Sequence, residues 1–200
     1  MAPSTRETLV AVAAQLMDEG GLDAVTLREV GRRAGMSHMA PYKHFPDKQA
    51  LLAAVAAREL AAQGAAMSRV TGAGGPPEAI IREVVHGYVA WAMAHPVRFK
   101  LVFGTWSAAS PELGAAAAQA HAALAVAVVA AQRAGALPGG DPARVTGLLI
   151  ALAHGAVDLA LAGHLTSGGA RPADPGDLVD DLLSYLRAAA PSPGGPRGHH

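Results

Sequence analysis

The chain has 200 residues, which is enough for one or two domains with a substantial core. Its 16 Lys and Arg balance 16 Asp and Glu, so the molecule as a whole lacks the strongly basic character usual for nucleic-acid binding. Because it has no cysteine, disulfides and thiolate metal sites are excluded, and the composition is compatible with a reducing cytoplasm.

The first predicted element is a helix over residues 4–19. Ser4-Thr5-Arg6-Glu7 has the spacing of a capping box, and Gly20-Gly21 ends the helix. Charged residues interrupt its apolar residues, so we do not expect a signal peptide here. The apolar residues that share one face of this helix are Leu9, Val10, Ala13, Leu16 and Met17.

Residues 26–48 predict two short helices joined by a tight turn and followed by a third helix. Thr26 and Glu29 have capping-box spacing at the start of the first, and Gly35 supplies the left-handed conformation that ends it. Ser37 is a good N-cap for the second, and Lys48 begins the longer third helix, over 48–66. Two helices joined by a short turn containing Gly form a helix-turn-helix unit, whose second helix enters the DNA major groove.

Local charge favours this use of the segment. Between positions 26 and 48 five cations face two anions, and two histidines add donors. The plain alternative is an ordinary helical corner with a solvated charged face. The charged residues and histidines are Arg28, Glu29, Arg32, Arg33, His38, Lys43, His44, Asp47 and Lys48.

Gly and Pro residues divide the rest of the chain into helices, with no run of alternating strand residues. The chain is therefore predicted to be all-α, with domains at 1–66 and 78–189, a Gly/Pro-rich linker at 71–77 and a disordered tail at 190–200. The residues from Leu113 to Gln132 have no charged side chain and approach the length of a membrane span, but they are rich in Ala, so we predict a buried helix. The predicted helices are 78–94, 96–104, 110–134, 142–165 and 175–189.

The last two predicted helices have features of a dimer interface. Gly147, Ala151 and Gly155 recur every four residues and form a stripe along which another helix can approach closely. The alternative is that these surfaces pack only inside one subunit. The final helix presents Leu178, Val179, Leu182, Leu183 and Leu186.

Aromatic residues are scarce, yet most gather in the middle helices. They either fill a core between Ala-rich helices or line a ligand pocket, and the core is the more common role for any single one. The aromatic residues in this region are Tyr88, Trp91, Phe99, Phe103 and Trp106.

The N-terminal segment resembles the DNA-binding domain of the TetR/AcrR family of bacterial transcriptional regulators. The resemblance covers about 50 residues, and it departs from the family pattern at Gly31, where Ala is commoner, and at Pro41, where Leu or Ile is usual. These two departures put the base contacts in question. The matching positions are Thr26, Val30-Gly31, Ala34-Gly35, Met36-Ser37, Tyr42-Lys43-His44-Phe45, Pro46-Asp47 and Lys48.

The resemblance implies a homodimer that binds a double-stranded DNA operator, with a four-helix bundle of last helices between subunits. On the recognition helix, His38, Met39 and Ala40, with Lys43 and His44, are expected at base edges. Phosphate contacts are expected from Ser37, Tyr42, Lys43, Lys48 and the flanking Arg28, with Thr26 at the helix start.

The resemblance also implies a pocket for a small hydrophobic inducer in the middle helices. Inducer binding would tilt the helix over 48–66 and change the separation of the recognition helices. Ala153-His154-Gly155 is similar to a His-Gly signature of one C-terminal subgroup, although Ile150 stands where that subgroup has Trp. The predicted ligand-binding residues are His86, Trp91, Phe103, Trp106, His121 and His154.

Other classes of protein fit the sequence less well. Nine histidines raise the question of a metalloenzyme, but none has His-Glu-x-x-His or His-x-x-x-His spacing, and no nucleophile elbow is present. A helical small-molecule-binding protein without sequence-specific DNA binding would leave the first 60 residues without a purpose. We therefore predict a cytoplasmic, ligand-responsive transcriptional regulator, most simply a repressor, that is not an enzyme and uses no metal or cofactor.

Overall fold

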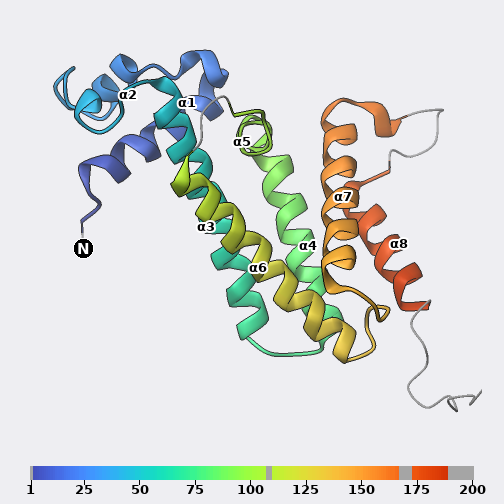
Figure 1. The fold of residues 1–200 in the computed structure, drawn as a ribbon. Coiled ribbons are helices and arrows are strands. Elements are labelled where there is room, and N and C mark those ends of the chain that lie inside the picture. The colour runs from blue at the N-terminus through green and yellow to red at the C-terminus, as the bar shows by residue number, and fades with distance from the viewer. Residues whose placement is uncertain (1, 107–109, 167–172, 189–200) are drawn as a thin grey trace, which may run out of the picture. The chain divides into compact units, whose positions relative to one another are not determined.

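The computed structural model describes residues 2–106, 110–166 and 173–188. Within these ranges the chain is entirely helical, with eight α-helices and two short 3-10 helices and no strand (Figure 1). The predicted all-α class is confirmed. The elements are α1 (Thr5–Ala24), α2 (Leu27–Arg33), η1 (Pro41–Lys43), α3 (Lys48–Gly72), α4 (Pro77–Ala94), α5 (Pro96–Val102), α6 (Pro111–Arg133), α7 (Pro142–Leu161), η2 (His164–Thr166) and α8 (Pro175–Ala188).

The helices pack in two compact units that are each discontinuous in sequence. One consists of Met1–Gln63 and His95–Ala120 and so contains α1, α2, η1, most of α3, α5 and the start of α6. The other consists of Gly64–Ala94 and His121–His200. The predicted domains at 1–66 and 78–189 are continuous stretches instead, and that division stays a prediction, as does the tail at 190–200, which lies outside the described residues.

Helix α1 begins as the sequence predicts. The hydroxyl of Ser4 accepts from the backbone N–H of Glu7 at 3.2 Å, while the Glu7 carboxylate accepts from the Ser4 N–H at 2.7 Å. The same bond lowers the pKa of the Glu7 carboxyl. Gly20 and Gly21 leave helical geometry, Gly21 at a φ of 73°, so α1 is kinked there rather than ended.

At α2 only half of the predicted capping box forms. The Thr26 hydroxyl accepts from the Glu29 N–H at 3.1 Å, but the Glu29 carboxylate accepts from Arg32 instead of turning back to the helix start. Arg32 lies one turn away, and a charge-assisted bond to it is stronger than one to a neutral amide. Val30 and Phe45 are buried in the core of this region.

The prediction of a second α-helix in the helix-turn-helix is wrong, because this segment forms a turn and a short 3-10 helix. Residues 38–40 make a turn, and Pro41–Lys43 make one 3-10 turn, so Ser37 caps no α-helix. Pro41 has no N–H to donate to the carbonyl of Ser37, which accepts from Ala40 at 2.9 Å instead. The following bonds from Lys43 and His44 also reach back three residues, which is the 3-10 pattern.

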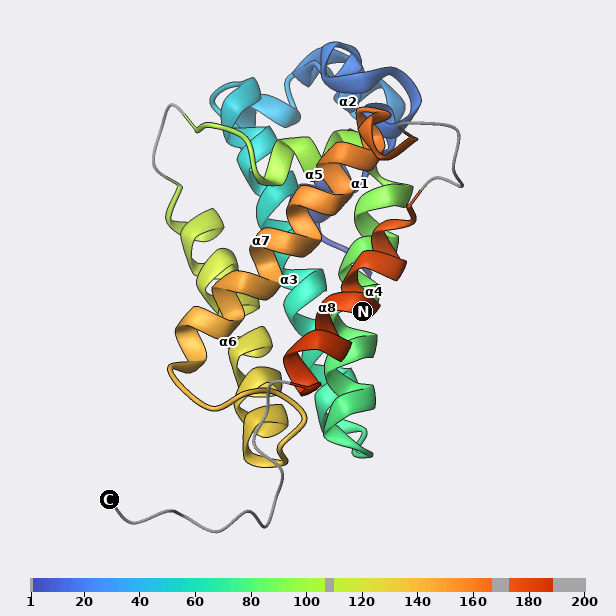
Figure 2. The same cartoon turned by 90° about the vertical axis from the view of Figure 1, so that its right-hand side faces the viewer.

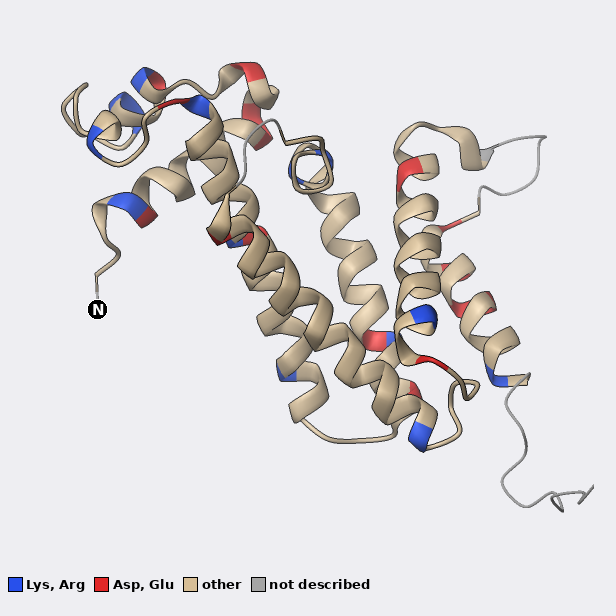
Figure 3. Cartoon of the chain, in the orientation of Figure 1, with Lys and Arg blue, Asp and Glu red and all other residues tan. Residues whose placement is uncertain are grey.

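Two further expectations need correction. Helix α3 extends to Gly72, so the linker predicted at 71–77 shortens to the residues between α3 and α4. Helix α6, predicted to be buried, has only 28% of its most apolar stretch buried, and α3, α6 and α7 are each long and apolar enough to cross a membrane. Figure 3 shows α6 without charged residues except near its ends.

In the second unit, α4 packs against both α7 and α8 (Figure 2). Ile81, Val84 and Val85 of α4 are buried. Polar contacts also join α8 to α4. The Asp180 carboxylate accepts from His86 at 2.7 Å and also pairs with Arg82. Hydrogen bonds from Arg82 and then His86 lower the pKa of the Asp180 carboxyl.

Asp180→Asn should lower the thermal stability of the protein at neutral pH by about 1 kcal/mol, because one partner of a partly exposed ion pair is lost. Since the folded-state pKa is lowered, the stabilisation is complete above the ordinary value of 3.8 and is lost as pH falls through the lowered value. Thermal unfolding of both proteins at a series of pH values measures this. Asp181→Asn, at an exposed neighbouring position, is the control, and an Asp180→Asn deficit that persists in strong acid contradicts the assignment.

Candidate functional site

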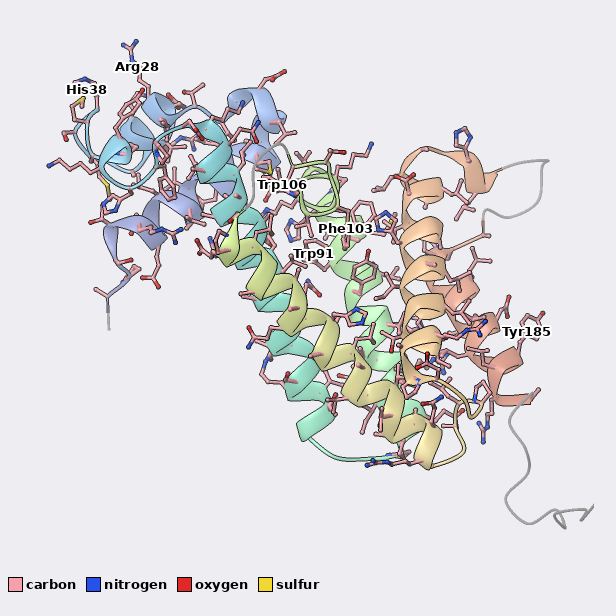
Figure 4. All side chains as sticks on the ribbon, in the orientation of Figure 1. Arg28, His38, Trp91, Phe103, Trp106 and Tyr185 are labelled. Atoms are coloured by element: carbon pink, nitrogen blue, oxygen red, sulfur yellow. The ribbon has the colours of Figure 1, made fainter. Side chains whose placement is uncertain are left out.

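The segment after α2 presents several side chains to solvent. Met39 is 51% exposed and Tyr42 47%, and both are large side chains that usually lie inside. Figure 4 shows Arg28 and His38 projecting away from the ribbon at this end of the unit. Of the ten predicted DNA-binding residues, Thr26, Arg28, Ser37, His38, Met39, Tyr42, Lys43 and His44 are exposed, while Ala40 and Lys48 are partly buried.

The positive charge available here is smaller than the sequence count. Arg32 pairs with Glu29 at 2.6 Å, and Arg33 pairs with Glu19 of α1 at 2.5 Å. These bonds lower the pKa of both carboxyls. Among the described residues, Arg28 and Lys43 have no carboxylate within ion-pair distance and so keep their charge for another partner.

Lys48 has a structural contact. Its ammonium donates to the backbone carbonyl of Leu22 at 2.6 Å, which joins the start of α3 to the end of α1. Two of its three donors remain for other acceptors. Lys48 thus holds two helices together, and its contact with a DNA phosphate stays a prediction.

The two positions that depart from the family pattern, Gly31 and Pro41, lie against each other. A Cβ atom built on Gly31 would lie 2.9 Å from Cγ of Pro41 and 3.2 Å from its Cδ. Both residues are buried, and a closed pyrrolidine ring has little freedom to move aside. The absence of a side chain at Gly31 thus allows the turn that carries Met39 and Tyr42 to approach α2 closely.

In the second unit, Tyr88 contacts two of the predicted ligand residues, Trp91 and His154, although Tyr88 itself was not predicted to bind ligand. The Tyr88 hydroxyl lies 3.2 Å from Nδ1 of His154, and the ring centroids of Tyr88 and Trp91 are 6.2 Å apart. Burial raises the pKa of Tyr88, which keeps its hydroxyl neutral. The i, i+3 spacing of Tyr88 and Trp91 on one helix is the signal in the sequence that could have placed Tyr88 beside the predicted ligand residues.

The other predicted ligand residues fall in both units. His86 is occupied by Asp180, and His121 is exposed. Phe103 and Trp106 belong to the other unit, where Phe103 is 44% exposed and packs on Phe99 at a centroid distance of 5.5 Å. The ligand assignment therefore stays a prediction.

Trp106 has a buried polar atom without a described partner. The indole Nε1 of Trp106 is buried and has no hydrogen-bond partner within the part of the chain that the structure describes. Figure 4 marks this residue together with Trp91 and Phe103. Over the same residues, no group of three or more His, Asp or Glu side chains is placed to hold a metal ion.

A capped helix, a tight turn and an exposed, partly cationic segment, attached to a further helical unit, define a helix-turn-helix transcriptional regulator. Two family models match the chain. One, described as bacterial regulatory proteins of the tetR family, covers residues 9–55, and the other, described as tetracyclin repressor-like C-terminal domain, covers residues 81–186. The chain belongs to the TetR family.

Individual relatives agree with this membership. An uncharacterized HTH-type transcriptional regulator of Mycobacterium bovis is 26% identical over 188 residues, covering 90% of this chain and 86% of that protein. A protein of unknown function from Rhodococcus is 29% identical, with a TM-score of 0.79 and coverage of 94% and 96%. The fold also matches that of Thermus thermophilus FadR, a TetR-family repressor in complex with lauroyl-CoA, at 20% identity, a TM-score of 0.66 and coverage of 95% and 100%.

Gly31→Ala should destabilise the protein by about 1 to 3 kcal/mol through overpacking against Pro41, despite the higher helix propensity of Ala. The double variant Gly31→Ala/Pro41→Ala should recover most of the lost stability, because the pyrrolidine ring with which the new methyl group clashes is absent. Denaturant unfolding of the single and double variants gives the coupling free energy. Gly87→Ala is the matched control, since a Cβ there meets no atom within 4 Å, and losses at 31 and 41 that simply add would contradict the contact.

Proposed function

We propose that this protein is a homodimeric, ligand-responsive repressor that leaves a palindromic DNA operator when it binds a small hydrophobic molecule. The observation that carries the proposal is the exposed segment after α2, where Met39, Tyr42 and Lys43 face solvent, and where Lys43 has no carboxylate partner among the described residues. Phosphate contacts from Lys43 and Arg28 would position each subunit. Met39 would contact thymine methyl groups, since this segment carries few long donors for guanine.

Dimerisation is supported by what α7 and α8 expose. A Cβ at Gly147 or Gly155 would meet no atom within 4 Å, so the predicted stripe of small residues is open in the single chain. Leu148 on the same helix is 57% exposed and Tyr185 on α8 is 72% exposed. Figure 4 shows Tyr185 projecting from α8. Two such faces related by symmetry would bury each other and bring two helix-turn-helix units to one operator.

The proposed effector is a small molecule with an apolar body. The Tyr88–His154 pair and the neighbouring Trp91 supply hydrogen-bonding groups beside an aromatic ring. Structures with this fold include FadR from Thermus thermophilus with lauroyl-CoA and FadR from Bacillus subtilis with stearoyl-CoA, the latter at 12% identity and a TM-score of 0.66. Long-chain acyl-CoA thioesters are therefore the first probes to test.

Release from DNA requires the effector to favour one conformation of the dimer. A ligand that bound the free and the DNA-bound dimer equally would shift nothing. We propose that the favoured state changes the separation of the two recognition turns through a movement of α3. As a TetR-family regulator the protein is expected to act in the cytoplasm, where its DNA is.

Fluorescence anisotropy on DNA from upstream of the protein's own gene, and on scrambled DNA of equal length, tests operator binding across a salt series. We expect tight binding to the first and weaker, more salt-sensitive binding to the second. Lys43→Ala should weaken both and reduce the salt slope by about one per subunit contact. Lys100→Ala, at an exposed position on α5, is the control. Equal, weak binding to both DNAs would favour a helical ligand-binding protein without an operator at this site.

Ala151→Arg should convert the dimer to monomer, because a long cation would then stand on the small-residue stripe. Ala151 is exposed in the single chain, so the subunit should still fold. Sedimentation equilibrium measures the mass, and anisotropy should show operator affinity reduced at least about tenfold. Ala62→Arg, at an exposed position on α3, is the control, and a dimer that survives Ala151→Arg would exclude α7 from the interface.

A further inference from the structure

An ion-pair cluster joins three helices of the N-terminal unit; Arg98 and Glu59 are largely buried in it, while Asp18 is 35% exposed. Arg98 of α5 is 14% exposed at its side chain. Its Nε donates to Asp18 of α1 at 2.9 Å, and its Nη2 pairs with the second oxygen of the same carboxylate. Its Nη1 lies 3.3 Å from the Glu59 carboxylate of α3.

Burial of Glu59 increases the energetic cost of breaking this cluster. Its side chain is only 8% exposed, and a carboxylate so far removed from water strongly requires a positive partner. Nη2 of Arg98 also donates to the backbone carbonyl of Ala14 at 3.4 Å. The guanidinium thus satisfies acceptors on α1 and α3 at the same time, with the fixed fork geometry that Lys cannot reproduce.

The clamped end of α1 leads directly to the helix-turn-helix. Asp18 is followed by Glu19, which pairs with Arg33 of α2, and Lys48 joins α3 to the carbonyl of Leu22. The Glu19–Arg33 pair is largely exposed and contributes little by itself. The buried end, at Arg98, therefore provides the stronger restraint on how α1 and α3 hold α2.

We propose that Arg98 is a positioning residue for DNA binding, which clamps α1 to α3 and so fixes the helix-turn-helix in the orientation that an operator requires. This rests on the proposed operator binding. In the wild-type protein the ion pairs already order these helices before DNA binds. Without them, the helices would become ordered only on binding, and the conformational entropy lost at that step would weaken operator affinity. Non-specific binding depends on phosphate neutralisation by surface cations, which Arg98 does not provide.

The position of Arg98 in the chain adds a second consequence. Only His95 separates the end of α4 from the start of α5, and its Nδ1 lies 3.6 Å from the Asp18 carboxylate. In the chain, one residue thus joins α4 to the helix that carries Arg98, and that residue itself lies beside Asp18. The cluster is the place at which the proposed effector response would loosen the DNA-binding helices.

The test uses the full chain and an operator selected with the wild-type protein from random DNA. Arg98→Gln should reduce specific affinity at least about tenfold, leave affinity for scrambled DNA within about twofold, and raise amide hydrogen exchange in residues 27–45. Asp18→Asn should act in the same direction. Asp18→Glu, which keeps the charge, should restore most of the specific affinity. Arg187→Gln, which breaks an exposed ion pair with Glu78, is the control.

Three outcomes would overturn the inference. In the first, Arg98→Gln lowers the unfolding temperature but leaves specific affinity unchanged, which makes Arg98 structural only. In the second, specific and non-specific affinity fall equally. In the third, Asp18→Glu is as defective as Asp18→Asn. If the wild-type protein selects no preferred sequence, the proposed operator binding itself has failed, and the hydrogen-exchange arm still decides whether Arg98 orders residues 27–45.

Discussion

The pairing of the buried Glu59 carboxylate with Arg98 is the interaction on which the N-terminal helices most depend. Apolar packing between Ala-rich helices is weakly directional, because small side chains allow one helix to slide on another. A buried carboxylate paired with a guanidinium tolerates such sliding less well, since its hydrogen bonds have defined lengths and directions. The ion pair therefore supplies geometric definition that the surrounding Ala residues cannot.

The surface proposed to bind DNA carries less positive charge than its sequence contains, because some of its cations are paired. Two of the arginines in this segment are held by carboxylates on α1 and α2. What remains exposed is a mixed surface with a thioether, a phenol, histidines and a few cations. Such a surface suits recognition of groove shape and thymine methyl groups better than bidentate reading of guanine.

Sequence reasoning located the helices well because Gly, Pro and capping residues act locally. The boundaries of α4, α5, α7 and α8 lie close to those expected from Pro and Gly positions. Pro41 is unusual in the sequence, but its effect on the second helix was not predicted, because in so short a helix one missing N–H decides between α and 3-10 bonding. Arg98 has partners on two helices that are distant in sequence, which no local pattern discloses.

The 3-10 turn at Pro41–Lys43 limits how much DNA sequence one subunit of the proposed dimer would read. Such a turn rises about 2.0 Å per residue, so Pro41–Lys43 extends only about 6 Å. That is less than two base-pair steps at about 3.4 Å each. In the proposed dimer, most of the discrimination between genomic sites would come from the distance and phasing between two brief half-sites, so a single inserted base pair in the spacer would be more harmful than a substitution within either half.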